Sequence, residues 1–262
     1  MASEPKNVAL VTGASSGIGR EIARVLAARK VDLVIAARRK DRLESLAEEL
    51  RNAHGIHVDV VATDLSRRDG ARQLYQDVRG LRTDVSILVN NAGFGLQNTV
   101  IDHTLDDLTR LIQVNITALT ELTRLFASDM KAAGRGYVLQ LSSIGAFQPT
   151  PMYAAYSAAK AYVPSFSYAM NRELAGTGVS ITSTCPGFTA TEFHEVAHHE
   201  KTGLMKRLSM SAERVADVSV AAMFRRKPMV VPGILNRING VLLEIMPRWL
   251  STAIVGGLMK KK

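Results

Sequence analysis

The sequence predicts an α/β protein in which helices cover both faces of a parallel β-sheet. Short apolar runs rich in β-branched residues alternate with longer segments whose apolar residues recur every three or four positions. No Pro- or Ser-rich linker, internal repeat or low-complexity tract interrupts this alternation, so the 262 residues are expected to form one domain. The predicted strands are 8–11, 31–36, 57–61, 85–89, 137–141, 179–184 and 229–231, and the first two helices are predicted at 20–29 and 41–51.

The composition is that of a folded protein in a reducing compartment. Hydrophobic residues make up 47% of the chain and charged residues 22%, which excludes a disordered or collagen-like protein. The single cysteine, Cys185, can form neither an internal disulfide nor a thiolate metal site. The first apolar run is too short for the core of a secretory signal, so we expect a cytoplasmic protein.

Basic charge is concentrated in the last quarter of the chain. The formal net charge is +9, yet residues 1–200 hold 21 basic and 21 acidic side chains, whereas residues 201–262 hold 12 basic and 3 acidic ones. Aromatic residues amount to only 5%, and no nucleic-acid-binding module is recognisable. We therefore expect no nucleic-acid partner.

Residues 234–262 are expected to form a basic amphipathic helical extension of the domain built from residues 1–233. Apolar residues over 234–250 fall on one broad helical stripe, outside which Arg237 and Arg248 lie. Polar residues interrupt this run too often for a membrane-spanning helix. Two alternatives stay open: the stripe packs on the core or a neighbouring subunit, or it is exposed and meets a membrane surface or an acidic acyl carrier.

A glycine-rich turn follows the first predicted strand and opens the first helix. It reads Thr-Gly-Ala-Ser-Ser-Gly-Ile-Gly, with glycines at positions 13, 17 and 19. Glycines let the backbone approach a pyrophosphate, whose charge is stabilised by the unpaired N–H groups at a helix N-terminus. The strand-turn-helix context therefore indicates a nucleotide site, the alternative being a turn that uses glycine for its geometry alone.

The end of the second predicted strand indicates which nucleotide is bound. An acidic residue there would bind the ribose hydroxyls of NAD, but this chain has Ala37, Arg38 and Arg39. A guanidinium suits a 2′-phosphate, so the sequence favours NADP unless these arginines form a solvated basic turn. Asp64, after the third strand, is a candidate for binding the adenine amino group or for capping a helix. The small residues within 90–93 allow close packing beside a ribose.

Ser143, Tyr156 and Lys160 form the candidate catalytic group. Tyr156 and Lys160 are four residues apart, so on a helix they share one face and the ammonium lies near the phenol. A tyrosine ordinarily titrates near pH 10, roughly, and an adjacent cation favours the phenolate, which makes the group a usable acid or base near neutrality. Ser143 follows the fifth predicted strand and could donate a hydrogen bond to a substrate carbonyl.

In the order and spacing of these motifs, the chain resembles the short-chain dehydrogenase/reductase family from about residue 7 to residue 232. The resemblance implies a single Rossmann-type, doubly wound domain with a seven-stranded parallel sheet and NADP(H) at the carboxyl ends of the strands. The matching residues are Thr12 to Gly19, Asp64, Asn90 to Gly93, Asn115, Ser143, Tyr156, Lys160, Pro186, Gly187 and Thr191.

The resemblance also implies a role for each catalytic residue. Tyr156 is expected to transfer the proton, and Lys160 to lower the pKa of Tyr156 and contact the nicotinamide ribose. Ser143 is expected to polarise the substrate, and Asn115 to anchor a water of the proton relay. The expected cofactor contacts are Gly13, Ser15, Ser16, Gly17, Ile18, Gly19, Arg38, Arg39, Asp64, Leu65, Asn91, Ala92, Gly93, Tyr156, Lys160, Pro186, Gly187, Thr189 and Thr191.

Within the family, three segments resemble a bacterial branch of broad-specificity reductases, related to enzymes that act on 3-oxoacyl thioesters, steroids and other lipophilic ketones. These segments are 147–151, 185–193 and 230–233, the last together with Asn236 and Arg237. We therefore expect an NADP(H)-dependent oxidoreductase, as a homodimer or homotetramer, that interconverts a lipophilic ketone or aldehyde and its alcohol. The alternative is an NADP-sensing scaffold without turnover, and either protein could be peripheral to a membrane. Substrate specificity is expected to come from loops 94–98, 147–153 and 188–206.

Two other patterns are interpreted as coincidences. Residues 194–198 read His-Glu-Val-Ala-His, the zinc-protease pattern, but no histidine follows at the spacing of a third ligand. Residues 157–160 read Ser-Ala-Ala-Lys, the acylation motif of penicillin-binding enzymes, without its partner motifs. We expect no metal, and we expect Ser157 on the surface of a helix.

Overall fold

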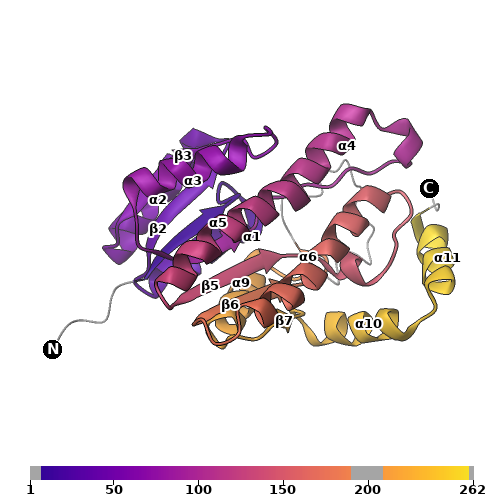
Figure 1. The fold of residues 1–262 in the computed structure, drawn as a ribbon. Coiled ribbons are helices and arrows are strands. Elements are labelled where there is room, and N and C mark those ends of the chain that lie inside the picture. The colour runs from indigo at the N-terminus through magenta and orange to yellow at the C-terminus, as the bar shows by residue number, and fades with distance from the viewer. Residues whose placement is uncertain (1–6, 190–208, 260–262) are drawn as a thin grey trace.

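The computed structural model describes residues 7–189 and 209–259, which form a seven-stranded sheet with helices on both faces (Figure 1). The strand order is β3-β2-β1-β4-β5-β6-β7, and every neighbouring pair is parallel. The predicted α/β fold is therefore confirmed. The strands are β1 (Val8–Thr12), β2 (Asp32–Ala37), β3 (Val58–Ala62), β4 (Val85–Asn90), β5 (Gly136–Leu141), β6 (Val179–Thr184) and β7 (Met229–Val230).

The central strands form where the sequence is mostly apolar. Every residue of β1 and β4 is buried, because helices cover both faces of a parallel sheet. The predicted strand ends differ from the observed ones by one residue at most. The first helix begins three residues earlier than predicted, at Gly17, because part of the glycine-rich turn itself adopts the helical conformation.

The helices divide into two layers. Residues of α1, α2 and α9 pack on one face of the sheet, and residues of α3 and α5 pack on the other, where α6 also lies. The main helices are α1 (Gly17–Ala28), α2 (Lys40–His54), α3 (Gly70–Leu81), α4 (Leu105–Ile112), α5 (Leu119–Ala132), α6 (Ala154–Glu173), α9 (Ala212–Phe224), α10 (Ile234–Ile245) and α11 (Arg248–Met259).

The chain changes direction across the sheet between β1 and β4. From β1 the order runs outward through β2 and β3 on one side and through β4 and β5 on the other. In open α/β sheets the crevice at the carboxyl ends of such neighbouring strands is where ligands bind. The glycine-rich turn after β1 and the 90–93 segment after β4 both open onto this crevice.

The C-terminal extension is two helices rather than the single stripe predicted. Met246 has an extended backbone (ψ 136°), as the residue before a proline prefers, so Pro247 separates α10 from α11. Most apolar side chains of the stripe are exposed, so the alternative in which the stripe packs on the core of its own chain is wrong. In the described part of the chain, no helix is long and apolar enough to cross a membrane.

Glycines let the inner side of the extension approach the core. A Cβ on Gly240 would lie 3.2 Å from the ring of Phe147, and a Cβ on Gly256 would lie 3.3 Å from Pro151. Figure 1 shows α10 and α11 on the side of the molecule where α6 begins. The extension therefore packs over the segment that precedes α6.

Candidate active site

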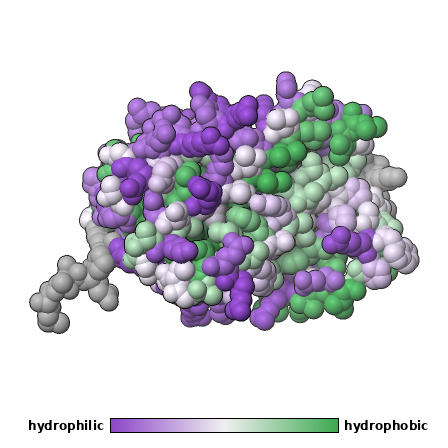
Figure 2. Space-filling view, viewed as in Figure 1, coloured by the Kyte–Doolittle hydropathy of each residue, from purple (hydrophilic) through white to green (hydrophobic). Residues whose placement is uncertain are grey.

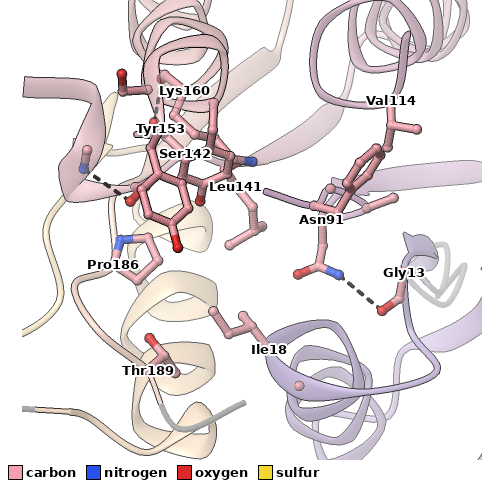
Figure 3. A pocket seen from close by; sticks show the side chains of 18 of the residues that line it. Gly13, Ile18, Asn91, Val114, Leu141, Ser142, Tyr153, Lys160, Pro186 and Thr189 are labelled. Atoms are coloured by element: carbon pink, nitrogen blue, oxygen red, sulfur yellow. Dashed lines mark hydrogen bonds between the residues drawn. The ribbon is translucent and has the colours of Figure 1, made fainter. Parts of the chain in front are cut away.

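A cavity of about 920 Å³ opens at the carboxyl ends of the strands. It reaches from the glycine-rich turn, past the start of α6, to the inner sides of α10 and α11. Figure 3 shows Lys160 across this cavity from Gly13 and Asn91. The cavity therefore joins the predicted nucleotide site to the predicted catalytic group.

The glycine-rich turn lies so close to the segment after β4 that side chains would not fit. A Cβ on Gly19 would lie 2.3 Å from Nδ2 of Asn91 and 2.5 Å from the carbonyl oxygen of Gly13. Gly13 itself has a φ of 67°, a conformation that glycine adopts without strain. The glycines thus expose the backbone at the N-terminus of α1, where a pyrophosphate is stabilised.

Thr12 and Asn91 hold the two loops together. The Thr12 hydroxyl accepts hydrogen bonds from the backbone N–H of Asn91 and of Ala92, each at 3.1 Å. Asn91 in turn donates from Nδ2 to the carbonyl oxygens of Thr12 at 2.9 Å and Gly13 at 3.1 Å. Sequence reasoning gave Thr12 no role, although a polar residue at the end of a buried central strand was a usable signal.

Arg38 and Arg39 both line the cavity but differ in their contacts. Arg39 is half-buried and donates to the hydroxyls of Ser15 at 3.1 Å and Ser16 at 2.8 Å. Arg38 is exposed. Arg39 therefore helps to shape the glycine-rich turn, while Arg38 is an exposed cation at the edge of the cavity.

Asp64 and Leu65 line the same end of the cavity. Burial acts to raise the pKa of Asp64, but hydrogen bonds from the N–H and hydroxyl of Ser66 outweigh it and hold this pKa below its usual value. Asp64 is therefore charged at neutral pH and shapes its own loop. Its contact with the adenine amino group stays a prediction.

Ser143 and Tyr156 both line the cavity and meet near the start of α6. The two side chains are hydrogen-bonded, and the Ser143 hydroxyl also accepts from the N–H of Gly145 at 3.1 Å. Burial raises the pKa of Tyr156 well above its usual value, and the bond with Ser143 offsets this only in part. The phenol therefore carries its proton at neutral pH.

That Lys160 lowers the pKa of Tyr156 stays a prediction. The Lys160 ammonium lies 5.7 Å from the centroid of the Tyr156 ring and donates to the carbonyl oxygen of Leu141 at 2.9 Å. At this separation, burial of the phenol dominates. The shared helical face was predicted correctly from the spacing, whereas the direction of the ammonium was not.

Lys160 makes stability depend on pH. Burial lowers the pKa of Lys160 to about 8, from 10.5 for an ordinary lysine. Between these values the unfolded chain binds more protons than the folded one, so stability rises with pH. The free energy of unfolding of the wild type, relative to Lys160→Met, should therefore increase from pH 8 to 10. Urea unfolding at several pH values measures this difference, and a flat difference would contradict the buried ammonium.

Asn115 lies in a π-helical turn, Gln113–Ala118, between α4 and α5. Its Nδ2 donates to the carbonyl oxygens of Phe94 and Leu111, both at 3.0 Å, while its buried Oδ1 has no hydrogen-bond partner among the described residues. A Cβ on Gly93 would lie 2.7 Å from this Oδ1 and 3.2 Å from Nζ of Lys160. The π-helical turn thus brings Asn115 beside Lys160, a feature common at functional sites.

The structure places part of the segment after β6 at the cavity. Pro186, Gly187 and Thr189 line it, and the Thr189 hydroxyl donates to the carbonyl oxygen of Gly187 at 3.0 Å. Thr191 and the His-Glu-Val-Ala-His pattern lie outside the described residues. Among the residues that are described, no group of three metal-ligating side chains occurs.

Sequence reasoning misplaced or missed four kinds of contact. Ser157, expected on a helix surface, is buried at 4% exposure and accepts a hydrogen bond from the N–H of Thr150 at 3.2 Å. Ser142 donates to the carbonyl oxygen of Lys160 at 2.7 Å. Tyr153 donates to Gln97 at 3.2 Å beside Tyr156, and burial raises its pKa to about 12. The extension also lines the cavity, through Asn239, Leu243, Met246, Ser251, Ile254 and Val255.

Comparisons with known proteins find similar proteins over most of the chain. A family model described as short chain dehydrogenase matches residues 7–202. The very-long-chain 3-oxoacyl-CoA reductase of Rattus norvegicus is 28% identical over 259 residues, which are 96% of this chain and 79% of the relative.

Two solved structures are also similar to the chain. A short-chain dehydrogenase from Sphingobium yanoikuyae in complex with NADPH has a TM-score of 0.82 and 29% identity, over 98% of this chain and 96% of that one. A bulky-bulky ketone specific alcohol dehydrogenase from Comamonas testosteroni has a TM-score of 0.77 and 27% identity, over 92% and 95% of the two chains.

Proposed function

Because the chain belongs to the short-chain dehydrogenase family, we propose that it is an NADP(H)-dependent oxidoreductase that interconverts a lipophilic ketone or aldehyde and its alcohol. One observation carries the proposal. Ser143, Tyr156, Lys160 and Asn115 line or adjoin one cavity, whose other end is the glycine-rich turn. Such an arrangement can hold a dinucleotide and a carbonyl compound side by side.

The residues present fit a nicotinamide dinucleotide. Gly13 and Gly19 have no room for a side chain, and a turn that presents only backbone suits a pyrophosphate. Arg38 and Arg39 supply cations at the end of the cavity where the adenine-side ribose would lie. When bound, the cofactor would supply the hydride. At the other end, Gly93 and Lys160 line the cavity so close together that a Cβ on Gly93 would lie 3.2 Å from Nζ of Lys160, which could contact the nicotinamide ribose.

The protein's own part is to bind the carbonyl and to supply the proton. Tyr156 is protonated at neutral pH, so in the reducing direction it can donate its proton to the carbonyl oxygen. The Ser143 hydroxyl, bonded to the same phenol, is placed to donate a second hydrogen bond to that oxygen. The unpartnered Oδ1 of Asn115 can accept a hydrogen bond from a water and so join Lys160 to a proton relay.

The proposed substrate class follows from the side chains of the C-terminal extension that line the cavity. Leu243, Met246, Ile254 and Val255 bring apolar side chains to the cavity beyond Tyr153. An apolar pocket with a few convergent polar groups suits a lipophilic carbonyl compound. Incubating the enzyme and NADPH with 3-oxoacyl thioesters, steroid ketones and bulky aryl ketones tests this; absence of NADPH oxidation with all three classes would contradict the proposal.

The cofactor preference is testable at the two arginines. Arg38→Ala should weaken NADPH binding by about 1.5–3 kcal/mol, the range for a hydrogen bond to a charged group, with little effect on NADH. Arg39→Ala should weaken the binding of both, because its guanidinium also positions Ser15 and Ser16. Fluorescence titration measures these affinities.

Lys40→Ala is the matched control, since it removes the same charge from a neighbouring side chain that pairs with Glu44. It should leave both affinities unchanged. Equal affinity of the wild type for NADPH and NADH would contradict the preference. A homodimer or homotetramer stays a prediction, which analytical ultracentrifugation would test.

A further inference from the structure

The helix α10 exposes its more apolar side. Six of its twelve residues are apolar side chains that are at least half exposed, and together they form what we term the tail face. A surface helix of a water-soluble domain turns its apolar side toward the core instead. The tail face consists of Ile234, Leu235, Ile238, Val241, Leu242 and Ile245.

The opposite side of α10 faces the rest of the protein. Gly240 packs against Phe147, and Leu243 and Met246 line the cavity. The helix is therefore fixed in an orientation that turns the tail face outward. Figure 2 shows hydrophobic residues gathered over α10 at the lower right of the molecule.

Basic residues and a tryptophan accompany the tail face. Arg237 adjoins it, because it lies one helical turn from both Ile234 and Val241. Trp249, the only tryptophan of the chain, is 74% exposed at the start of α11, next to Arg248. Glu244 is the one acidic residue of the two helices in the described part of the chain. Exposed aliphatic side chains with an arginine at their edge, and an exposed tryptophan on the next helix, are typical of helices that lie in a membrane interface.

We propose that the tail face docks on a lipid bilayer that carries anionic headgroups. The apolar side chains of α10 would enter the boundary of the acyl chains, and Arg237 and Arg248 would meet the headgroups. The helices lie on the bilayer, since neither is long enough to cross it. Because the same helices line the cavity with their inner sides, a lipophilic substrate would pass from the bilayer along apolar side chains.

The charge of the C-terminal segment favours a lipid bilayer over a second copy of the chain as the partner of the tail face. Residues 234–262 carry five basic side chains and one acidic side chain, so two copies that met through this segment would repel each other. An anionic lipid surface attracts the same charge. This docking does not depend on the proposed function, because it is measured without substrate or turnover.

The test is co-sedimentation of the full chain with vesicles, read together with the emission of Trp249. Vesicles of phosphatidylcholine with phosphatidylglycerol should pellet the protein and shift the tryptophan emission to shorter wavelength. Vesicles of phosphatidylcholine alone should bind it more weakly. Arg248→Gln should lower the partition coefficient on the anionic vesicles about fivefold, as expected for one basic residue at such a surface.

Two variants show whether vesicle binding depends on the tail face or on exposed apolar side chains in general. Ile245→Glu should lower the partition coefficient roughly tenfold or more, since the side chain no longer enters the apolar boundary. Leu81→Glu changes the charge equally at another exposed side chain, at the end of α3, and should not alter vesicle binding. Neither residue lines the cavity, so reductase activity on a water-soluble ketone should stay at the wild-type level.

Three results would overturn the proposal. The first is the absence of protein from the pellet with anionic vesicles. The second is binding that Ile245→Glu and Leu81→Glu reduce equally. The third is a dimer in ultracentrifugation that Ile245→Glu dissociates, which would assign the tail face to a second copy of the chain.

Discussion

Replacing Tyr156 by phenylalanine should lower kcat for carbonyl reduction by roughly 10²- to 10⁴-fold, the usual contribution of a general acid. The variant keeps the ring that packs against Tyr153 but loses the proton that burial retains on the phenol. Affinity for NADPH should stay near the wild-type value, because the lost hydroxyl acts on the substrate. Steady-state kinetics with NADPH and the best ketone, together with a cofactor titration, measure both quantities.

Tyr168→Phe is the matched control for this variant. Tyr168 lies on the same helix, is about half exposed, and does not line the active-site cavity. Its loss should leave kcat unchanged. Substantial turnover by Tyr156→Phe would contradict the role of Tyr156 as the general acid. It would favour the alternative in which the protein binds the cofactor without chemistry at Tyr156.

Replacing Gly19 by alanine should both destabilise the protein and weaken cofactor binding. The new Cβ would lie 2.3 Å from Nδ2 of Asn91 and 2.5 Å from the carbonyl oxygen of Gly13, so the two loops must separate. Overpacking of this kind typically costs about 1–3 kcal/mol of stability. Because the hydrogen bonds of Asn91 hold the turn that would receive the pyrophosphate, NADPH affinity should fall as well.

The control is Gly80→Ala, where a Cβ would meet nothing within 4 Å. Gly80 lies in α3, so alanine there should raise stability by about 0.4–1 kcal/mol. Thermal unfolding with and without NADPH compares the two variants. A Gly19→Ala protein as stable as the wild type and equally stabilised by NADPH would contradict the close approach of the two loops.

Sequence patterns predicted the sheet well, for a physical reason. Strands such as β1 and β4 are buried on both faces, so they appear as short, mostly apolar runs rich in β-branched residues. The spacing of Tyr156 and Lys160 likewise predicted a shared helical face, because it depends only on the helix repeat.

Sequence patterns failed where the outcome depends on which neighbour packs against a residue. Spacing placed Lys160 near Tyr156 but could not show that its ammonium binds Leu141, nor that burial dominates the pKa of the phenol. Ser157 looked like a surface residue because the burial of its helix face depends on the segment around Thr150. The apolar stripe of the extension showed amphipathicity but not which side faces the core.

Transfer of deuterium from NADPH to a ketone tests most directly whether the protein is a carbonyl reductase. The enzyme would be incubated with NADPH that carries deuterium at the transferable position of the nicotinamide, and with the most reactive lipophilic ketone. We expect an alcohol with one deuterium on the carbinol carbon, seen by mass spectrometry, and no such product from Tyr156→Phe on the same timescale. An enzyme that binds NADPH and the ketone but yields no deuterated alcohol would contradict this expectation.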